Sequence, residues 1–148
     1  MNHKRIVGVV SFLVVSGFLG ACSRPAPATA SVPLPAQEGV YFITPRNADT
    51  VASPVVVRFG LKGRGVAPAN VNLPNTGHHH LLVDAADLPP MTAPIPSDAK
   101  HVHFGGGQTE TTVTLPPGQH TLQLVLGDHL HVPLGKEWVS EKITITVK

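Results

Sequence analysis

Short runs of alternating apolar and polar residues fill the chain from Val40 to its end. β-Branched residues are frequent in these runs, Pro and Gly separate them, and no long segment carries the 3.6-residue period of an amphipathic helix. In a strand, side chains two residues apart share a face, so this alternation predicts strands with one buried face. Seven strands are expected, at 40–44, 55–61, 78–84, 100–104, 109–115, 120–126 and 142–147.

The last part of the chain has the order of elements found at the end of many immunoglobulin-like domains. A Pro-Pro-Gly turn at 116–118 leads into an alternating strand, which is followed by a loop containing Asp128 and by a final strand. We therefore predict one all-β domain over residues 39–148, an immunoglobulin-like β-sandwich of about seven strands. Segment 85–99 is rich in proline and is expected to be an irregular loop, of a length that often carries function.

A small cupin-like barrel is the alternative fold. His101, His103 and Glu110, followed by a Pro-x-Gly turn and His120, are similar in order to the cupin metal motifs. The spacings depart from those motifs, because Glu110 lies too far from His103 and His120 comes one residue early after the turn. The sandwich is therefore the favoured prediction.

The first 21 residues resemble the signal peptide of a bacterial lipoprotein. Lys4 and Arg5 form a basic start, residues 6–19 are mainly apolar, and Leu-Gly-Ala-Cys at 19–22 resembles the lipobox. In that pattern the chain is cut before Cys22, whose thiol carries the lipid. The apolar run is shorter than the roughly 20 residues of a spanning helix, which argues against a retained membrane anchor.

Cys22 is the only cysteine, so the chain has no intrachain disulfide and no cysteine-based metal site. Residues 22–38 contain four prolines among small residues and are expected to form an extended tether. Ser23 stands where a lipoprotein retained in the inner membrane usually has aspartate. By resemblance to Gram-negative sorting, we expect an outer-membrane lipoprotein that faces the periplasm.

Charge argues against nucleic acid as a partner. The chain has 11 Lys and Arg against 9 Asp and Glu, and Lys4 and Arg5 leave with the signal peptide, so nine basic side chains remain against nine acidic ones. No basic stripe is present of the kind that nucleic-acid binding needs. The nine histidines are a more informative feature, because all except His3 follow residue 77.

Three His-x-His pairs are the main candidate for chemistry. In a strand each pair places two imidazoles on one face, where they can converge on one metal ion, while the residue between them faces the core with its apolar neighbours. His79 is accordingly expected to face the core. The predicted ligands are His78, His80, His101, His103, His129 and His131.

Imidazole ligands favour copper as Cu(II), with Zn(II) as the alternative. A thioether-rich Cu(I) site is not expected, because Met91 is the only methionine outside the signal peptide. Asp84, Asp128 and Glu110 are candidates to accept the second N–H of a ligating ring. The alternative role for Asp128, as for Asp98, is to cap a turn. His120 is expected to be packed and hydrogen-bonded rather than a ligand.

Several longer motifs resemble one bacterial family. They are Gly-His-His-His-Leu-Leu-Val-Asp at 77–84, Ile-Pro-Ser-Asp at 95–98, His-Phe-Gly-Gly-Gly-Gln-Thr-Glu at 103–110 and Leu-Pro-Pro-Gly-Gln-His-Thr-Leu-Gln-Leu at 115–124. These motifs are similar to the bacterial domain-of-unknown-function 4399 family, and the resemblance runs from about Gly39 to the end. The family name implies no activity, so function rests on the residues themselves.

Three functions follow from these residues. The first is an envelope lipoprotein that binds Cu(II) or Zn(II) for storage, delivery or resistance, with a metal-handling protein as partner. The second is a cupin-like metalloenzyme with an open metal position. The third is a structural or interaction module of the cell envelope without a metal. No nucleophile motif or phosphate loop is present in the sequence, which favours a binding role over catalysis.

Overall fold

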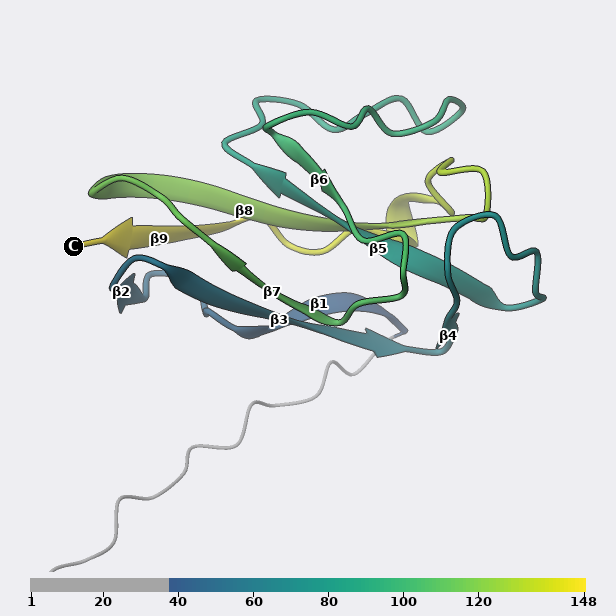
Figure 1. Cartoon of the computed structure of the whole chain (residues 1–148), viewed down its shortest axis with the longest axis horizontal. Coiled ribbons are helices and arrows are strands. Elements are labelled where there is room, and N and C mark those ends of the chain that lie inside the picture. Colours follow the sequence, from purple (N-terminus) through teal and green to yellow (C-terminus); the bar gives the residue numbers. More distant parts are fainter. Residues whose placement is uncertain (1–37) are drawn as a thin grey trace, which may run out of the picture. The chain divides into compact units, whose positions relative to one another are not determined.

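The structure is a computed structural model that describes residues 38–148, and these residues form two β-sheets (Figure 1). The predicted signal peptide, Cys22 and the tether up to residue 37 lie outside the described residues. No helix in the described part of the chain is long and apolar enough to span a membrane.

Nine strands and one short 3₁₀ helix make up the domain. In chain order they are β1 (Gly39–Thr44), β2 (Thr50–Val51), β3 (Val55–Lys62), β4 (Gly65–Val66), β5 (Thr76–Val83), β6 (His101–His103), β7 (Glu110–Val113), β8 (Gly118–Gly127), η1 (Lys136–Trp138) and β9 (Ile143–Val147). All seven predicted strands are present. β2 and β4 were not predicted, because two residues are too few to show alternation.

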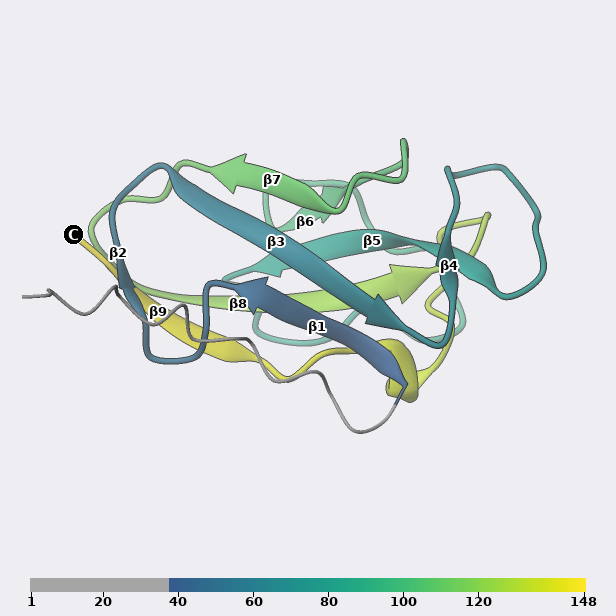
Figure 2. The same cartoon turned by 90° about the horizontal axis from the view of Figure 1, so that it is seen from below.

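The strands divide into two open sheets. One has the order β1-β3-β7, and the other has the order β2-β9-β8-β5-β4, with β6 paired to β5. Figure 2 shows β3 crossing in front of β5 and β8, with β1 and β7 on either side of β3. Among the seven predicted strands, β1, β3 and β7 form one sheet, and β5, β6, β8 and β9 belong to the other. This division follows the immunoglobulin arrangement. The β-sandwich is confirmed, and the cupin-like barrel is wrong because neither sheet closes.

The sandwich core lies between the inner faces of the two sheets. Leu81, Leu124 and Ile145 are fully buried there, and Val57 and Phe59 face them from β3. Alternating residues of β3 and β9 are exposed or half-buried, as expected for strands with one buried face.

β5 is unusual because both of its faces are buried. Its residues from Gly77 to Val83 all lack substantial exposure, and Leu82 packs on the outer face with Ala85, Ile95 and Val125 in a second, smaller core. The loop 85–99, irregular as predicted, covers this outer face together with the segment that follows β8. The Ile95 amide donates a hydrogen bond of 2.9 Å to the His131 carbonyl, which ties the two covering segments together.

Candidate metal centre

The outer face of β5 carries the first pair of histidines. His78 and His80 are 0% and 1% exposed, and their Nε2 atoms lie 3.0 Å apart. His79 points to the opposite face, as predicted, where its ring lies 5.2 Å from that of Phe59. β5 therefore places His78 and His80 on its outer face and His79 in the sandwich core on its inner face.

β6 adds a third imidazole to the same face. It pairs antiparallel with β5 so that His103 stands directly opposite His80. One ligand nitrogen from each of His78, His80 and His103 lies within 4.8 Å of the others, and this is the only such group of His, Cys, Asp or Glu in residues 38–148. Nitrogens that share a metal are at most about 4.2 Å apart, so shifts below about 1 Å suffice for coordination.

His131 brings a fourth imidazole from the turn after β8. Its ring centroid lies 5.0 Å from that of His78, 4.7 Å from His103 and 6.0 Å from His80. The other three ring pairs are separated by 4.8, 5.0 and 5.1 Å. Imidazoles arranged around one metal have centroids about 5 Å apart, given coordination near 2 Å. We call His78, His80, His103 and His131 the histidine cluster.

Two glycines leave room for these rings. A Cβ on Gly127, which pairs with His78 across the sheet, would lie 3.0 Å from Nε2 of His80. A Cβ on Gly105 would collide with the His103 ring. The absence of side chains at these positions is therefore part of how the cluster is packed.

Three rings of the cluster, those of His78, His80 and His103, are held in their neutral form. The pKa of His78 is lowered to about 4 and that of His80 to about 3, mainly by burial and to a smaller extent by the neighbouring histidines. Burial and His131 also lower the pKa of His103. At neutral pH these rings therefore keep a nitrogen lone pair for a metal ion.

Several ring nitrogens of the cluster have no protein partner. Nδ1 of His78, Nδ1 of His80 and Nε2 of His103 are buried without a hydrogen bond. A buried polar atom left unsatisfied costs roughly 1–3 kcal/mol, and native proteins contain few of them. Three such atoms in one place require a partner from outside the chain, such as ordered water or a metal ion.

The other two predicted ligands lie outside the cluster. His101 stands opposite Leu82 on β6, and its Nδ1 lies 2.8 Å from Oδ1 of Asp98. His129 belongs to a turn rather than a strand, and Leu130, expected in the core, is 57% exposed. The expectation that His129 and His131 share one face of a strand is therefore wrong, whereas the loop predicted around Asp128 is present.

Asp128 explains the turn that replaces this strand. Its Oδ1 accepts hydrogen bonds from the backbone amides of Leu130 and Val132, at 2.8 and 2.9 Å. His131 has a φ of 69°, in the left-handed region that ends such turns. The hydrogen bonds of Asp128 therefore show the turn-capping role. Its charge also opposes, in part, the lowering of the His78 pKa.

The other two candidate carboxylates hydrogen-bond to groups outside the cluster. Oδ2 of Asp84 lies 2.7 Å from Nδ1 of His120, which the sequence predicted to be packed and hydrogen-bonded. Glu110 pairs with Arg58 at 2.9 Å on the exposed face of the other sheet. In the described chain no Asp or Glu joins the three grouped imidazoles.

Replacing His79 with leucine is expected to stabilise the metal-free protein by about 1 kcal/mol, because neither ring nitrogen of His79 has a hydrogen-bond partner in its buried position. Leucine has a similar volume and suits the neighbouring Phe59. Urea unfolding of both proteins measures the change. A His79→Ala variant is the control for volume and should be destabilised. A less stable His79→Leu variant would mean that the imidazole makes favourable contacts. The Gln108 backbone is one such neighbour, and it raises the pKa of His79 against the larger lowering by burial.

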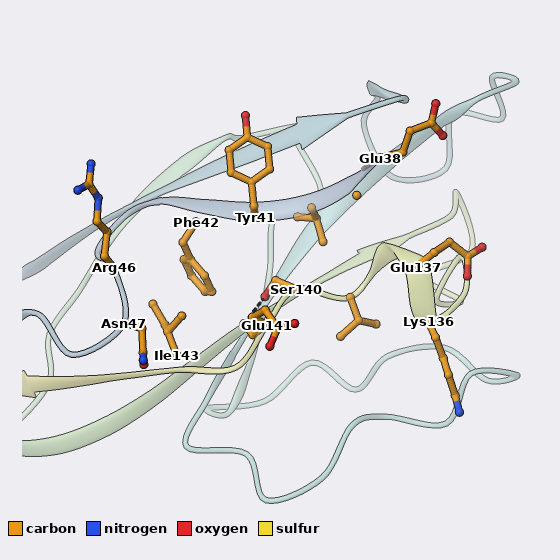
Figure 3. A pocket seen from close by; sticks show the side chains of 13 residues that line it. Glu38, Tyr41, Phe42, Arg46, Asn47, Lys136, Glu137, Ser140, Glu141 and Ile143 are labelled. Carbon is orange, nitrogen blue, oxygen red and sulfur yellow. Dashed lines mark hydrogen bonds between the residues drawn. The ribbon is translucent and has the colours of Figure 1, made fainter. Parts of the chain in front are cut away.

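A pocket without histidines lies elsewhere in the domain. It has a volume of about 560 Å³ and lies between β1, η1 and the start of β9. In Figure 3, Phe42 and Ile143 point toward its interior, and charged side chains such as Glu38 and Lys136 stand at its edge. A smaller pocket of about 130 Å³ is lined by His78, Asp128 and Arg64.

Comparison with known proteins gives a family but no activity. Residues 57–148 match the family model described as "Domain of unknown function (DUF4399)". No curated protein and no solved structure matches the chain. The matched region contains every member of the histidine cluster.

Proposed function

Because the chain belongs to the DUF4399 family, whose description names no activity, its function has to be inferred from its residues: we propose that it is an envelope lipoprotein that binds a transition-metal ion. His78, His80 and His103 are the proposed ligands, and His131 is the proposed fourth. The role is storage, delivery or resistance, and a metal-handling protein would be its partner.

One observation carries this proposal. Three imidazoles from two paired strands bring ligand nitrogens within 4.8 Å of one another, in a buried place where several of their nitrogens lack any other partner. The rings of His78 and His80 share one hydrogen bond between their Nε2 atoms, and this bond leaves Nδ1 of both rings and Nε2 of His103 unsatisfied. A metal ion compensates the burial of such groups, and neutral imidazole is a good ligand for it.

Copper as Cu(II) is the proposed metal, with Zn(II) as the alternative. Affinity for nitrogen ligands peaks at Cu(II) among the divalent first-row metals, and Cys22, the only cysteine and the proposed lipid anchor, leaves no thiolate to favour zinc or Cu(I). The proposed location is the outer membrane, facing the periplasm. It is supported by the lipobox-like Leu-Gly-Ala-Cys at 19–22 and by Ser23.

The test compares two histidines of one strand. His103→Ala removes a cluster ligand, whereas His101→Ala removes the same side chain two residues away, outside the cluster. Loss of an outer partner of a ligand typically weakens metal binding 10–100-fold, so His103→Ala is expected to weaken Cu(II) binding by about 100-fold or more. His101→Ala should leave the affinity unchanged. Competition titrations of the purified full chain with a chelator of known affinity measure both.

Two results would contradict the proposal. The first is an unchanged chain that fails to bind Cu(II) or Zn(II) more tightly than micromolar, which would favour an envelope module without a metal. The second is equal loss of affinity in both variants, which would place the metal outside the cluster. His131→Ala and His129→Ala form a second matched pair within the turn, and the same contrast is expected between them.

A further inference from the structure

The four rings of the histidine cluster do not form a closed tetrahedral set. Five of the six ring separations lie between 4.7 and 5.1 Å, but His80 and His131 are 6.0 Å apart. A regular tetrahedral arrangement would give six equal separations of about 5 Å. The imidazoles whose ligand nitrogens lie within 4.8 Å of one another are His78, His80 and His103, without His131, so this group of three leaves a coordination position open toward the turn.

The cluster also supplies no negative charge to a metal ion. Imidazoles with lone pairs free are neutral, and no carboxylate of the described chain belongs to the group of three. Asp128 is near enough to influence His78, but its Oδ1 accepts two backbone amides of its own turn. A divalent ion in this buried place would therefore keep at least one uncompensated positive charge, which is costly away from water.

One side of the cluster is accessible. His78 and His80 are shut off from solvent at 0% and 1% exposure, whereas His103 and His131 are only half-buried. A ligand from solution would reach the metal from the side of the turn rather than through the sheet. The widest ring separation is that between His80 and His131, and His131 belongs to this turn. The gap in the cluster therefore lies on its solvent-accessible side.

We propose that the metal held by the histidine cluster takes one small anion from solution as an additional ligand, bound on the side of His131. This inference rests on the proposed metal-binding function and adds a ligand class to it. The anion, such as hydroxide or a small carboxylate, completes the coordination sphere and supplies the charge that the cluster lacks. The metal centre is thus open rather than closed.

Azide is a suitable probe, because it is a small anion whose binding to Cu(II) produces a charge-transfer absorption band. The full chain is loaded with one equivalent of Cu(II) in a buffer whose anions coordinate weakly, and azide is then titrated. We expect the band to appear and to saturate at one azide per copper. Copper content is measured after the titration to confirm that the metal has stayed bound.

A matched pair of variants in one turn sharpens the test. His131→Asp places a carboxylate at the open side, on a backbone conformation that aspartate tolerates. Its copper affinity is measured alongside, and the copper that this variant holds should bind azide at least tenfold more weakly. His129→Asp adds the same charge to the same turn outside the cluster, and azide should still bind as in the unchanged chain.

The outcomes separate this inference from the function on which it rests. Copper that binds tightly but shows no azide band would overturn the open centre and leave metal binding intact. Equal azide affinity in the two aspartate variants would place the anion elsewhere and would also overturn it. A chain that binds no copper overturns the proposed function itself and this inference with it.

Discussion

The metal-free protein is expected to lose stability steeply as the pH falls from 6.5 toward 4. His78, His79 and His80 are buried and neutral, and burial is the largest cause of their lowered pKa values of about 4, 4 and 3. In the unfolded chain each has its ordinary pKa of 6.5 and takes up a proton below that pH. The unfolded state then binds more protons than the folded one, so stability falls with pH.

The size of this effect makes it decisive for the domain. Each histidine contributes up to about 1.4 kcal/mol per pH unit while only the unfolded state is protonated. Three of them together would remove roughly 5 kcal/mol or more by pH 5, against a total of about 5–15 kcal/mol for a typical domain. Urea unfolding at half-unit pH steps, with metal removed by a chelator, measures the dependence.

Two leucine variants serve as controls for the acid effect. His79→Leu removes one of the three buried histidines without touching the cluster, so the pH dependence should weaken by about a third. His101→Leu removes a histidine that is less buried and paired with Asp98, and the dependence should persist. A stability that stays flat between pH 6.5 and 4.5 would show that the three rings are not buried in neutral form.

Saturating metal is expected to raise stability by about 4 kcal/mol when free metal exceeds its dissociation constant 1,000-fold. The metal binds the folded chain, in which three strand histidines are already gathered, and the unfolded chain does not hold them together. Protons compete for the same nitrogens only near the lowered pKa values of the folded site, about 4 for His78 and about 3 for His80, so the stabilisation should persist at pH 5 and shrink toward pH 4. Thermal unfolding in the presence of Cu(II) or Zn(II), and again after chelation, measures the shift.

The cluster variants decide whether this stabilisation comes from the proposed site. His103→Ala should lose most of the metal-induced shift, and His101→Ala should keep it. Unfolded chains that contain histidines also bind copper, which reduces the shift, so Zn(II) provides the cleaner comparison. A shift that is the same in both variants would assign the metal to another group of residues.

The sandwich could be predicted from sequence because its signals are local. Alternation along β3 and β9 shows which residues face inward, and the Pro-Pro-Gly turn at 116–118 marks the start of β8. Alternation also placed His79 in the core and His78 with His80 on the other face. These inferences need only the two-residue period of a strand.

The composition of the cluster could not be predicted in the same way. Alternation puts His101 and His103 on one face, but the register of β6 against β5 decides which of them meets His80. Register depends on contacts between distant segments, so the two histidines are indistinguishable in the sequence. The turn at Asp128 is a different case, because an aspartate after glycine was a usable signal that competed with the His-x-His pattern.

The ligands of the cluster differ in how firmly the backbone holds them. His78, His80 and His103 belong to hydrogen-bonded strands, whereas His131 is carried by a short turn attached through Asp128 and the Ile95 amide. Dissociation of a bound ion would begin with the turn ligand, since the sheet ligands cannot move without breaking strand pairing. Transfer to an acceptor would then be an ordered exchange in which an incoming group first replaces His131, and the residence time of the ion would be set by that turn.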